Sequence, residues 1–389
     1  MKGNSLKVLN AIRSVAGSDY QARIPEAVRT NIAEVGNTIL SYTPHTNLML
    51  TQLINRIGRV TIERMESMDD VYGAFKESKL SKGDTIQKIF IDIPKAHAFE
   101  GTNTLTPTSM LSIEKGVIHV EYTSVDRRMF YKRTISKSEL QEAFISVEAL
   151  DDFIRGIIES MMTALGYDKY IMVTEALYEH CKYVVEVEAQ ASGDAQNKVK
   201  VLHVPSTVAK YNKTTKEIEW DTVGAKDFLK ILRIVTGNMK FPHALGYATF
   251  DSNGDIDDEY SIEAQRTPRE RQILGLEVSS MANIDVDALA TLFNLAKADL
   301  KTQVIELEDD ALGLYVDSDS NEVYVGGFIC DKNAVDRGTS FEDTDSFKNP
   351  EHEYVNFWRH FWGWIAISKF KDFVPIVFTT YTPTQSEGE

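Results

Sequence analysis

The sequence predicts a mixed α+β fold built from more than one lobe. One stretch beginning at Ser146 has the apolar spacing of a long helix, and residues 182–335 mix alternating strand patterns with helical ones. A third stretch, residues 354–368, is apolar on both alternating sides. The chain has 389 residues, 43% hydrophobic and 26% charged, which is ordinary globular composition at a length typical of two or three domains.

The first 75 residues have helical patterns but no evident core of their own. Residues 25–40 place apolar side chains at helical spacing, and Pro25 suits a first turn. Residues 46–58 repeat the pattern and end at Gly58, a residue that favours a helix end. We therefore expect loose amphipathic helices that need another surface.

Residues 84–134 predict a long β-hairpin around a Thr-rich loop. Its second half carries a basic cluster of Arg127, Arg128, Lys132 and Arg133. Two strands alone are marginal in water, so the hairpin is expected to lie on something else, such as another subunit. The basic cluster could contact nucleic acid or an acidic protein surface, and the 58 acidic residues of the chain favour the protein surface.

Residues 146–181 give the strongest helix prediction, with Ser146 as a cap and an apolar stripe that includes Ile157 and Met161. Gly166 weakens the pattern, so a break there is an open alternative. Beyond it the patterns predict strands at 182–190, 198–206, 302–310 and 312–328 and helices at 224–238 and 283–300.

Residues 354–368, YVNFWRHFWGWIAIS, hold three of the four tryptophans of the chain. Apolar side chains on both sides, with aromatic and β-branched residues, favour a strand buried on both faces, although a helix fits the periodicity too. We expect Trp358, Phe361 and Trp362 to pack against the long helix near Ile157 and Met161. A polar loop is predicted before this strand, at 336–352, and a final strand after it, at 371–382.

Charge and cysteine content exclude several classes of protein. The net charge of −16 and a pI near 5.1 argue against binding nucleic acid through the overall field of the chain. Two cysteines are too few for a disulfide framework, which favours reduced thiols in a cytosolic compartment. The N-terminus does not have a signal-peptide pattern, and no stretch is apolar enough to span a membrane.

The usual catalytic and cofactor motifs are missing from the sequence. Phosphate-loop, dinucleotide-binding and nucleophile-elbow patterns do not occur, and His352 and His360 lie eight residues apart, too far for a zinc motif on one helical turn. Residues 251–259, DSNGDIDDE, alternate acidic side chains like a calcium loop, but Gly254 is misplaced and the closing Glu is absent. A hairpin turn explains them better, so no catalytic, cofactor-binding or metal residue is predicted.

Three segments, taken in order, resemble the major capsid proteins of small short-tailed phages of the podovirus, picovirus type, and more loosely those of crass-like phages. The first is 53–96, which carries Asn55-Arg56-Ile57-Gly58, Phe75-Lys76 and Gly83-Asp84-Thr85-Ile86; the others are 282–300 and 354–378. Each motif alone is unspecific, but their order and spacing fit most of the chain.

The resemblance implies the Hong Kong 97-type capsid fold. It assigns 1–75 to an N-terminal arm, 76–140 to an extended β-hairpin loop, 141–190 to a peripheral domain with a spine helix, 191–335 to an axial domain, and 336–389 to a return to the peripheral domain and a C-terminal tail. It also implies inter-subunit contact by the basic cluster of the extended loop.

The implied function is a major capsid protein that self-assembles into pentamers and hexamers of an icosahedral head enclosing double-stranded DNA. The expected partners are other copies, a portal, a scaffolding protein, and a head fibre or decoration protein, with weak DNA contact and no membrane. The location would be the virion, assembled in the host cytoplasm. Two alternatives stay open: a shell protein of a non-viral compartment, and a metal-dependent enzyme using Asp251, Asp255, Asp257 and Glu259.

Overall fold

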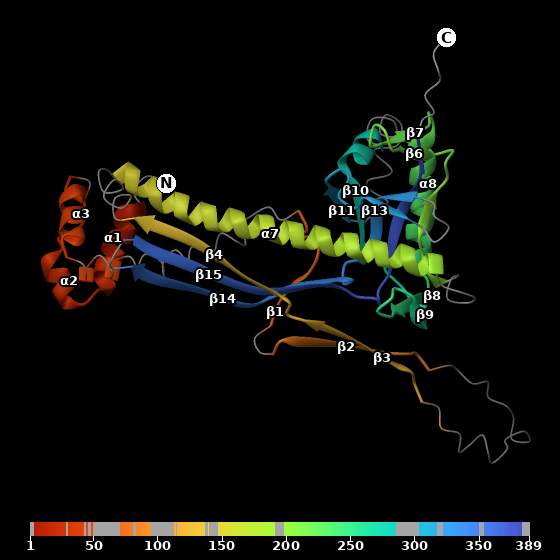
Figure 1. Ribbon diagram of the computed structural model, residues 1–389, viewed down its shortest axis with the longest axis horizontal. Helices are drawn as coiled ribbons and strands as arrows, with labels where there is room; N and C mark the ends of the chain where they lie inside the picture. The colour runs from red at the N-terminus through yellow and green to blue at the C-terminus, as the bar shows by residue number, and fades with distance from the viewer. Residues whose placement is uncertain are drawn as a thin grey trace, which may run out of the picture.

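The computed structural model shows an elongated molecule arranged along one long helix (Figure 1). It describes residues 4–28, 30–42, 44–45, 48–49, 71–80, 83–94, 113, 115–136, 139, 147–190, 198–284, 303–316, 322–349 and 354–382. Small helices lie at one end of the long helix, a large sheet lies at the other, and a narrow sheet joins them.

The long helix, α7, runs from Val147 to Gln190 without a break. Its 44 residues correspond to about 66 Å at the usual rise per residue. The predicted helix is confirmed and Gly166 does not interrupt it. The strand predicted at 182–190 is wrong, because Val173, Leu177, Cys181 and Val184 enter one core at helical spacing and this part of the chain continues the helix.

The N-terminal helices are α1 (Asn4–Val15), α2 (Ser18–Arg23) and α3 (Ile32–Leu40). The helix predicted from residue 25 therefore begins only at Ile32, and most of the helix predicted at 46–58 lies outside the described residues. Buried side chains of this group share a core with Met161 of α7 and with Val355 and Phe357. As expected, these helices complete their core on another part of the chain.

A four-stranded sheet lies along α7 in the order β1 (Glu77–Lys79), β14 (Val335–Asn349), β15 (Tyr354–Ile367), β4 (Arg127–Ser136). The strand predicted at 354–368 is confirmed as β15. The polar loop predicted at 336–352 is wrong over most of its length, because its residues pair with β15 from Val335 to Asn349. Cross-strand pairing with an aromatic neighbour overrides the weak strand propensity of a polar sequence.

The larger, eight-stranded sheet has the path β11 (Gln303–Leu307), β10 (Gln272–Glu277), β13 (Glu322–Asp331), β16 (Phe373–Tyr381), β6 (Ala209–Asn212), β7 (Glu217–Trp220), with β12 (Leu314–Val316) on β13 and β5 (Leu202–Val204) on β16. Helix α8 (Gly224–Met239) packs beside it, as predicted at 224–238. The final strand β16 belongs to this sheet, whereas β14 and β15 belong to the four-stranded sheet.

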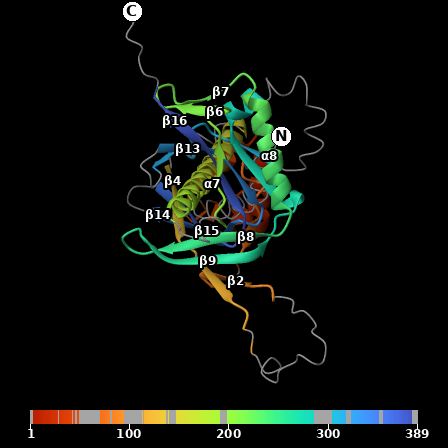
Figure 2. The ribbon, with the colours of Figure 1, turned by 90° about the vertical axis from the view of Figure 1, so that its right-hand side faces the viewer.

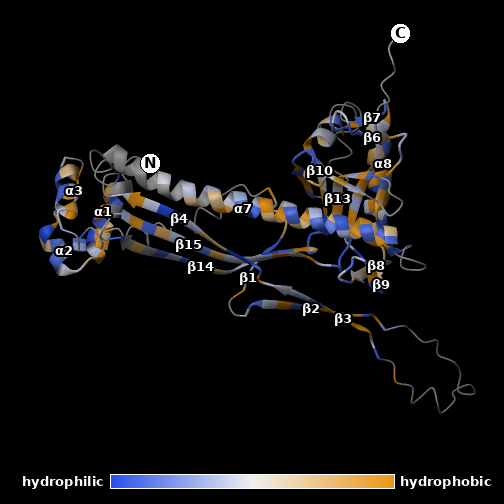
Figure 3. Cartoon of the chain, viewed as in Figure 1, coloured by the Kyte–Doolittle hydropathy of each residue, from blue (hydrophilic) through white to orange (hydrophobic). Residues whose placement is uncertain are grey.

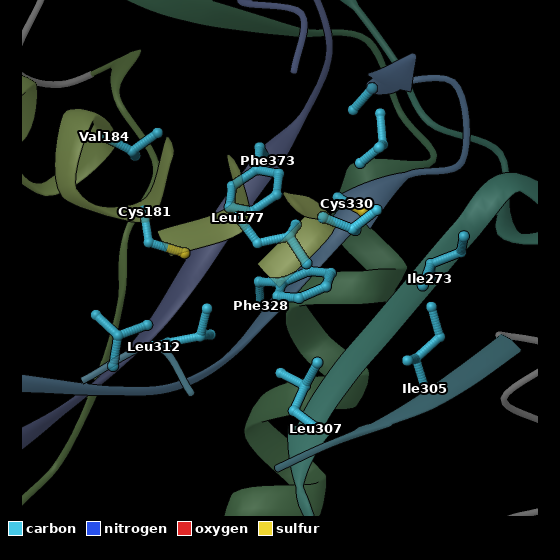
Figure 4. Packing of buried hydrophobic residues seen from close by; sticks show 14 of the residues in the cluster. Leu177, Cys181, Val184, Ile273, Ile305, Leu307, Leu312, Phe328, Cys330 and Phe373 are labelled. Carbon is cyan, nitrogen blue, oxygen red and sulfur yellow. The ribbon is translucent and has the colours of Figure 1, made fainter. Parts of the chain in front are cut away.

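Figure 4 shows the core between α7 and this sheet. Leu177 and Cys181 of α7 face Phe328 and Cys330 of β13, and Phe328 stacks on Phe373 with ring centroids 5.2 Å apart. Both cysteine thiols are fully buried, and burial raises the pKa of each. They act here as small apolar side chains.

Two separate hairpins complete the fold. β8 (His243–Phe250) pairs with β9 (Ile256–Gln265), and β2 (Thr85–Ile91) pairs with β3 (Ile118–Ser124). Figure 2 shows the β8–β9 hairpin crossing beneath the end of α7, with β2 below it. A short 3₁₀ turn covers Arg269–Arg271, and residues 278–284 are helical, next to the helix predicted at 283–300, most of which is outside the described residues.

Candidate interaction surfaces

One face of the β2–β3 hairpin is fixed to the body of the molecule. His119 of β3 is buried, and its Nδ1 lies 2.9 Å from the Tyr247 hydroxyl. Phe90 of β2 packs with its ring centroid 6.1 Å from that of Phe370, and Tyr247 and Phe370 belong to the same buried cluster. The hairpin is therefore held near the loop end of its two strands by aromatic contacts.

The opposite face of the same hairpin is apolar and exposed. Its apolar residues are Ile89, Ile91, Ile118, Val120 and Tyr122, with 41% to 67% of each side chain accessible. Register places Ile89 opposite Val120 and Ile91 opposite Ile118, so the side chains form one continuous patch. We call these five residues the hairpin patch. A contiguous apolar patch on a folded protein marks a binding surface.

The basic cluster was expected on the hairpin. It lies instead on β4, the edge strand of the four-stranded sheet. The chain leaves β3 at Ser124 and enters a different sheet three residues later, at Arg127. Arg127 binds Glu175 at 3.2 Å, and Arg128 binds Asp84 at 3.4 Å.

Trp358 and Trp362, which were predicted to pack against α7, lie on the face of β15 that points away from this helix. Side chains alternate along a strand, and Phe361 is the one that contacts Leu165 and Met172 of α7. Met161 is buried with Val355 and Phe357, and the side chain of Ile157 is outside the described part. The expected core therefore includes Phe361 and Met161, while Trp358 and Trp362 are only half-buried.

Cations from β4 cover both of those indole rings. The guanidinium of Arg128 lies 4.9 Å from the Trp362 ring centroid, and the Lys132 ammonium lies 5.6 Å from that of Trp358. On the other side, the ring of Phe341 from β14 lies 4.7 Å from Trp362. Trp364 is the fully packed tryptophan, at 2% exposure, and its ring occupies the space that a side chain on Gly338 would need.

A network of buried polar groups lies at the connections between the two sheets. Asp372 accepts a hydrogen bond from the Thr267 hydroxyl at 2.7 Å, and its other oxygen lies 2.7 Å from His243 Nε2. Asp331 pairs with Arg271. Asp331 ends β13 and Asp372 precedes β16, so this network fixes the two connections between the sheets rather than forming an open reactive site.

Glu277, at the end of β10, is the buried carboxyl with the most unusual environment. It accepts hydrogen bonds from the Tyr324 hydroxyl and, at 3.3 Å, from the backbone N–H of Asp310. Burial nevertheless raises the pKa of Glu277 to about 7.

The acidic turn considered for calcium is a hydrogen-bonded turn. Asp251 accepts bonds from the backbone N–H groups of Asn253 at 2.8 Å and Asp255 at 3.0 Å, and these bonds lower the pKa of Asp251. Among the described residues, no three His, Cys, Asp or Glu side chains are placed to hold a metal ion. None of the described helices has the length and apolarity that crossing a membrane requires.

Hydropathy colouring shows where polar and apolar residues alternate along the strands of the narrow sheet and the hairpin (Figure 3). The sequence predicts the hairpin, but it does not identify which of its two faces is exposed. Alternation with polar residues was the available signal, and it does not say which side another part of the chain covers.

Comparison with known proteins gives one consistent result. Residues 9–377 match the family model described as Phi29-like phage major capsid protein. The major capsid protein of Bacillus phage B103 is 25% identical over 381 residues, covering 96% of this chain and 73% of its own length. That of Streptococcus phage Cp-1 is 23% identical over 371 residues, covering 95% of this chain and 93% of its own.

A solved capsid structure shares the fold. The capsid protein in the structure of Staphylococcus phage Andhra aligns over 79% of this chain and 83% of its own length, with a TM-score of 0.51 and 12% identity. At that identity the similarity concerns the fold alone.

Proposed function

Because this chain belongs to the Phi29-like phage major capsid protein family, and is a structural subunit of a tailed-phage shell with the Hong Kong 97-type fold, we propose how it assembles. Copies associate into pentamers and hexamers that close into an icosahedral head around double-stranded DNA. The proposal extends to assembly in the host cytoplasm, and to a chain that acts in the shell without catalytic activity.

The observation that supports this mode of assembly is the hairpin patch. Its five apolar side chains are exposed in the single chain, while the other face of the same hairpin is anchored by Phe90 and His119. Removing such side chains from water is favourable, at roughly 1.5–3 kcal/mol for a fully buried Ile or Val. A neighbouring copy that covers the patch would gain this free energy in every contact of the shell.

We also propose which parts of the chain form the domains of the fold. The four-stranded sheet and α7 would be the peripheral domain, and the eight-stranded sheet with α8 the axial domain. Residues 1–75 would be the arm and the β2–β3 hairpin the extended loop, with β4 belonging to the peripheral sheet.

Other head components are proposed as partners: a portal, a scaffolding protein, and a head fibre or decoration protein. Contact with packaged DNA would be weak, because the chain has a net charge of −16 and phosphate is repelled by such a surface. No membrane partner is proposed.

Sedimentation of the full chain, produced in bacteria together with the other head proteins of its phage, tests the proposal. We expect megadalton particles that contain this chain. A clean monomer under these conditions would contradict the assembly proposal. Particles that hold enzyme cargo instead of DNA would favour a non-viral compartment, and loss of a measured activity in Asp255→Ala would favour a metal-dependent enzyme.

Deleting residues 97–116 tests the contribution of the hairpin to assembly. We expect the shortened chain to fold as a monomer and to fail to form particles, because the extended loop can no longer reach a neighbour. The deletion leaves the five residues of the hairpin patch in place, so normal particles from this variant would contradict the role given to the extended loop beyond the patch.

A further inference from the structure

We infer that neighbouring copies meet along opposite edges of the four-stranded sheet, with the basic strand β4 of one copy facing the acidic strand β14 of the next. This inference rests on the proposed function, since it names the surfaces that associate within the shell. It comes from the distribution of charge across one sheet.

The β4 edge is uniformly basic. From Arg127 to Ser136 the strand carries four cations and no acidic residue. Arg128, Lys132 and Arg133 are exposed. Arg127 and Arg128 have carboxylate partners, whereas Lys132 and Arg133 form no ion pair with any residue in the described ranges. Attraction from this strand is therefore available to an incoming acidic surface.

The β14 edge is acidic over its outer half. Glu342, Asp343 and Asp345 lie there with a single cation, Lys348. Strand β1 pairs with β14 only at residues 337–339, so within the described part of the chain the outer side of β14 has no strand partner beyond them. Glu342 is partly neutralised by Arg359 at 3.4 Å, and Asp345 lies 3.7 Å from His360 Nε2, while Asp343 and Asp345 both remain exposed.

The two edges lie on opposite sides of the same sheet. Both strands are antiparallel to β15, which lies between them, and Figure 1 shows β4 and β14 flanking it. Complementary surfaces on opposite sides of one molecule associate head to tail, and repetition by rotation closes a ring. A two-fold contact of β4 with β4 would instead bring cations together, which is unfavourable.

The overall charge strengthens this assignment. With a net charge of −16, most surfaces of two copies repel each other, so an acid-free strand is a preferred point of contact for another copy. An open strand edge is also a surface that proteins normally cover. We therefore choose a second copy, rather than nucleic acid, as the occupant of the β4 edge.

Charge reversal with rescue tests the inference in the full chain, produced with the other head proteins of its phage. One variant carries Lys132→Glu and Arg133→Glu, and a second carries Asp343→Lys and Asp345→Lys. Each places like charges at the contact, so particle yield should fall at least about tenfold. The chain carrying all four changes should recover most of the yield, because the contact again joins opposite charges.

Mixing gives a second readout. When the two reversed variants are produced in the same cells, each supplies the edge that the other lacks, so alternating copies should associate into rings with an even number of subunits, which neither variant forms alone. The changed residues are exposed, and circular dichroism with thermal unfolding checks that each variant folds. If a reversed variant fails to fold, the milder Lys132→Gln and Arg133→Gln pair replaces it, with reduced yield as the expected result.

Lys226→Glu with Lys230→Glu is the matched control for the reversed β4 variant. It changes the net charge of the chain by the same amount, but on exposed residues of α8. It should assemble like the natural chain. Normal yields from both reversed variants, or four changes that fail to rescue a folded chain, would overturn the edge contact while leaving the proposed function intact. Reversed β4 variants that assemble normally but lose packaged DNA would also overturn it. Failure of the natural chain to form particles would contradict the proposed function itself.

Discussion

The core beside the eight-stranded sheet and the β2–β3 hairpin use the same kinds of side chain in opposite ways. In the core, Phe328, Ile329 and Cys330 of β13 have no exposed surface. On the hairpin, Ile91 and Ile118 are about three-fifths exposed, at 61% and 60%. The core is covered within one chain, whereas the hairpin patch is exposed in the single chain, and we propose that another copy covers it. Stability and assembly should therefore separate: changes in the core unfold the subunit, and changes on the patch leave it folded but unable to associate.

The largest expected effect on stability is at Phe328. Its ring is buried, stacks on Phe373 and fills the space over Gly275. Phe328→Ala should lower the free energy of unfolding by about 3–5 kcal/mol, because it leaves a cavity between α7 and the sheet. Urea unfolding of the isolated subunit measures this, and a loss below about 1 kcal/mol would show that the core is not closed as described.

Within the single strand β15, one tryptophan is buried and another is only half-buried, so the two can be compared directly. Trp364→Ala should cost about 3–5 kcal/mol, since the ring is 2% exposed. Trp362→Ala should cost markedly less, about 1–2 kcal/mol, because the ring is half-buried and is covered by Arg128 and Phe341. Equal losses in the same unfolding assay would mean that both rings are packed alike.

Glu277 predicts how core stability depends on pH. Burial raises the pKa of Glu277 to about 7 in the folded chain, above its usual value near 4.3 in an unfolded chain. The folded state therefore holds the carboxyl proton of Glu277 more tightly than the unfolded state does. The contribution of this proton to the free energy of unfolding is fully present below about pH 4 and is lost as the pH rises to about 7. Between pH 5 and pH 8 the natural chain should lose on the order of 2 kcal/mol relative to Glu277→Gln. A constant difference between the two proteins across this range would contradict the assignment.

The smallest expected effect on stability is on the hairpin patch. Ile91→Lys combined with Tyr122→Lys changes two exposed side chains that do not face each other across the hairpin, so the free energy of unfolding should move by less than about 0.5 kcal/mol per site. Particle yield should nevertheless collapse, because two charges would have to be buried against the neighbour. Val223→Lys combined with Ile234→Lys, at exposed apolar positions elsewhere, is the matched control. Normal particles from the hairpin variant would remove the distinction between the two regions.

Sequence patterns predicted those helices and strands whose apolar spacing follows directly from which of their own side chains are buried. Helix α7, helix α8 and strand β15 were found because their apolar spacing matches the side that is covered. Strand β14 was missed, because a polar strand is stabilised by its neighbour rather than by its own residues. Residues 182–190 were assigned to a strand because their valines alternate, although in the structure they continue a helical stripe.

The surfaces were harder to predict than the elements. The basic cluster was identified correctly as a group, but its place on β4 depends on a pairing with β15, more than 200 residues away in the sequence. The choice between the two faces of β15 was also wrong for Trp358 and Trp362. Alternation divides the side chains into two sets, and only tertiary packing decides which set meets the helix.

The central claim is that another copy of the chain covers the hairpin patch in the assembled shell. A cryo-EM map of purified particles, at a resolution that shows side chains, tests it most directly by showing what contacts Ile89, Ile91, Ile118, Val120 and Tyr122. We predict closed particles in which these residues are buried against a neighbouring subunit. Particles in which all five side chains remain exposed to solvent would contradict the claim.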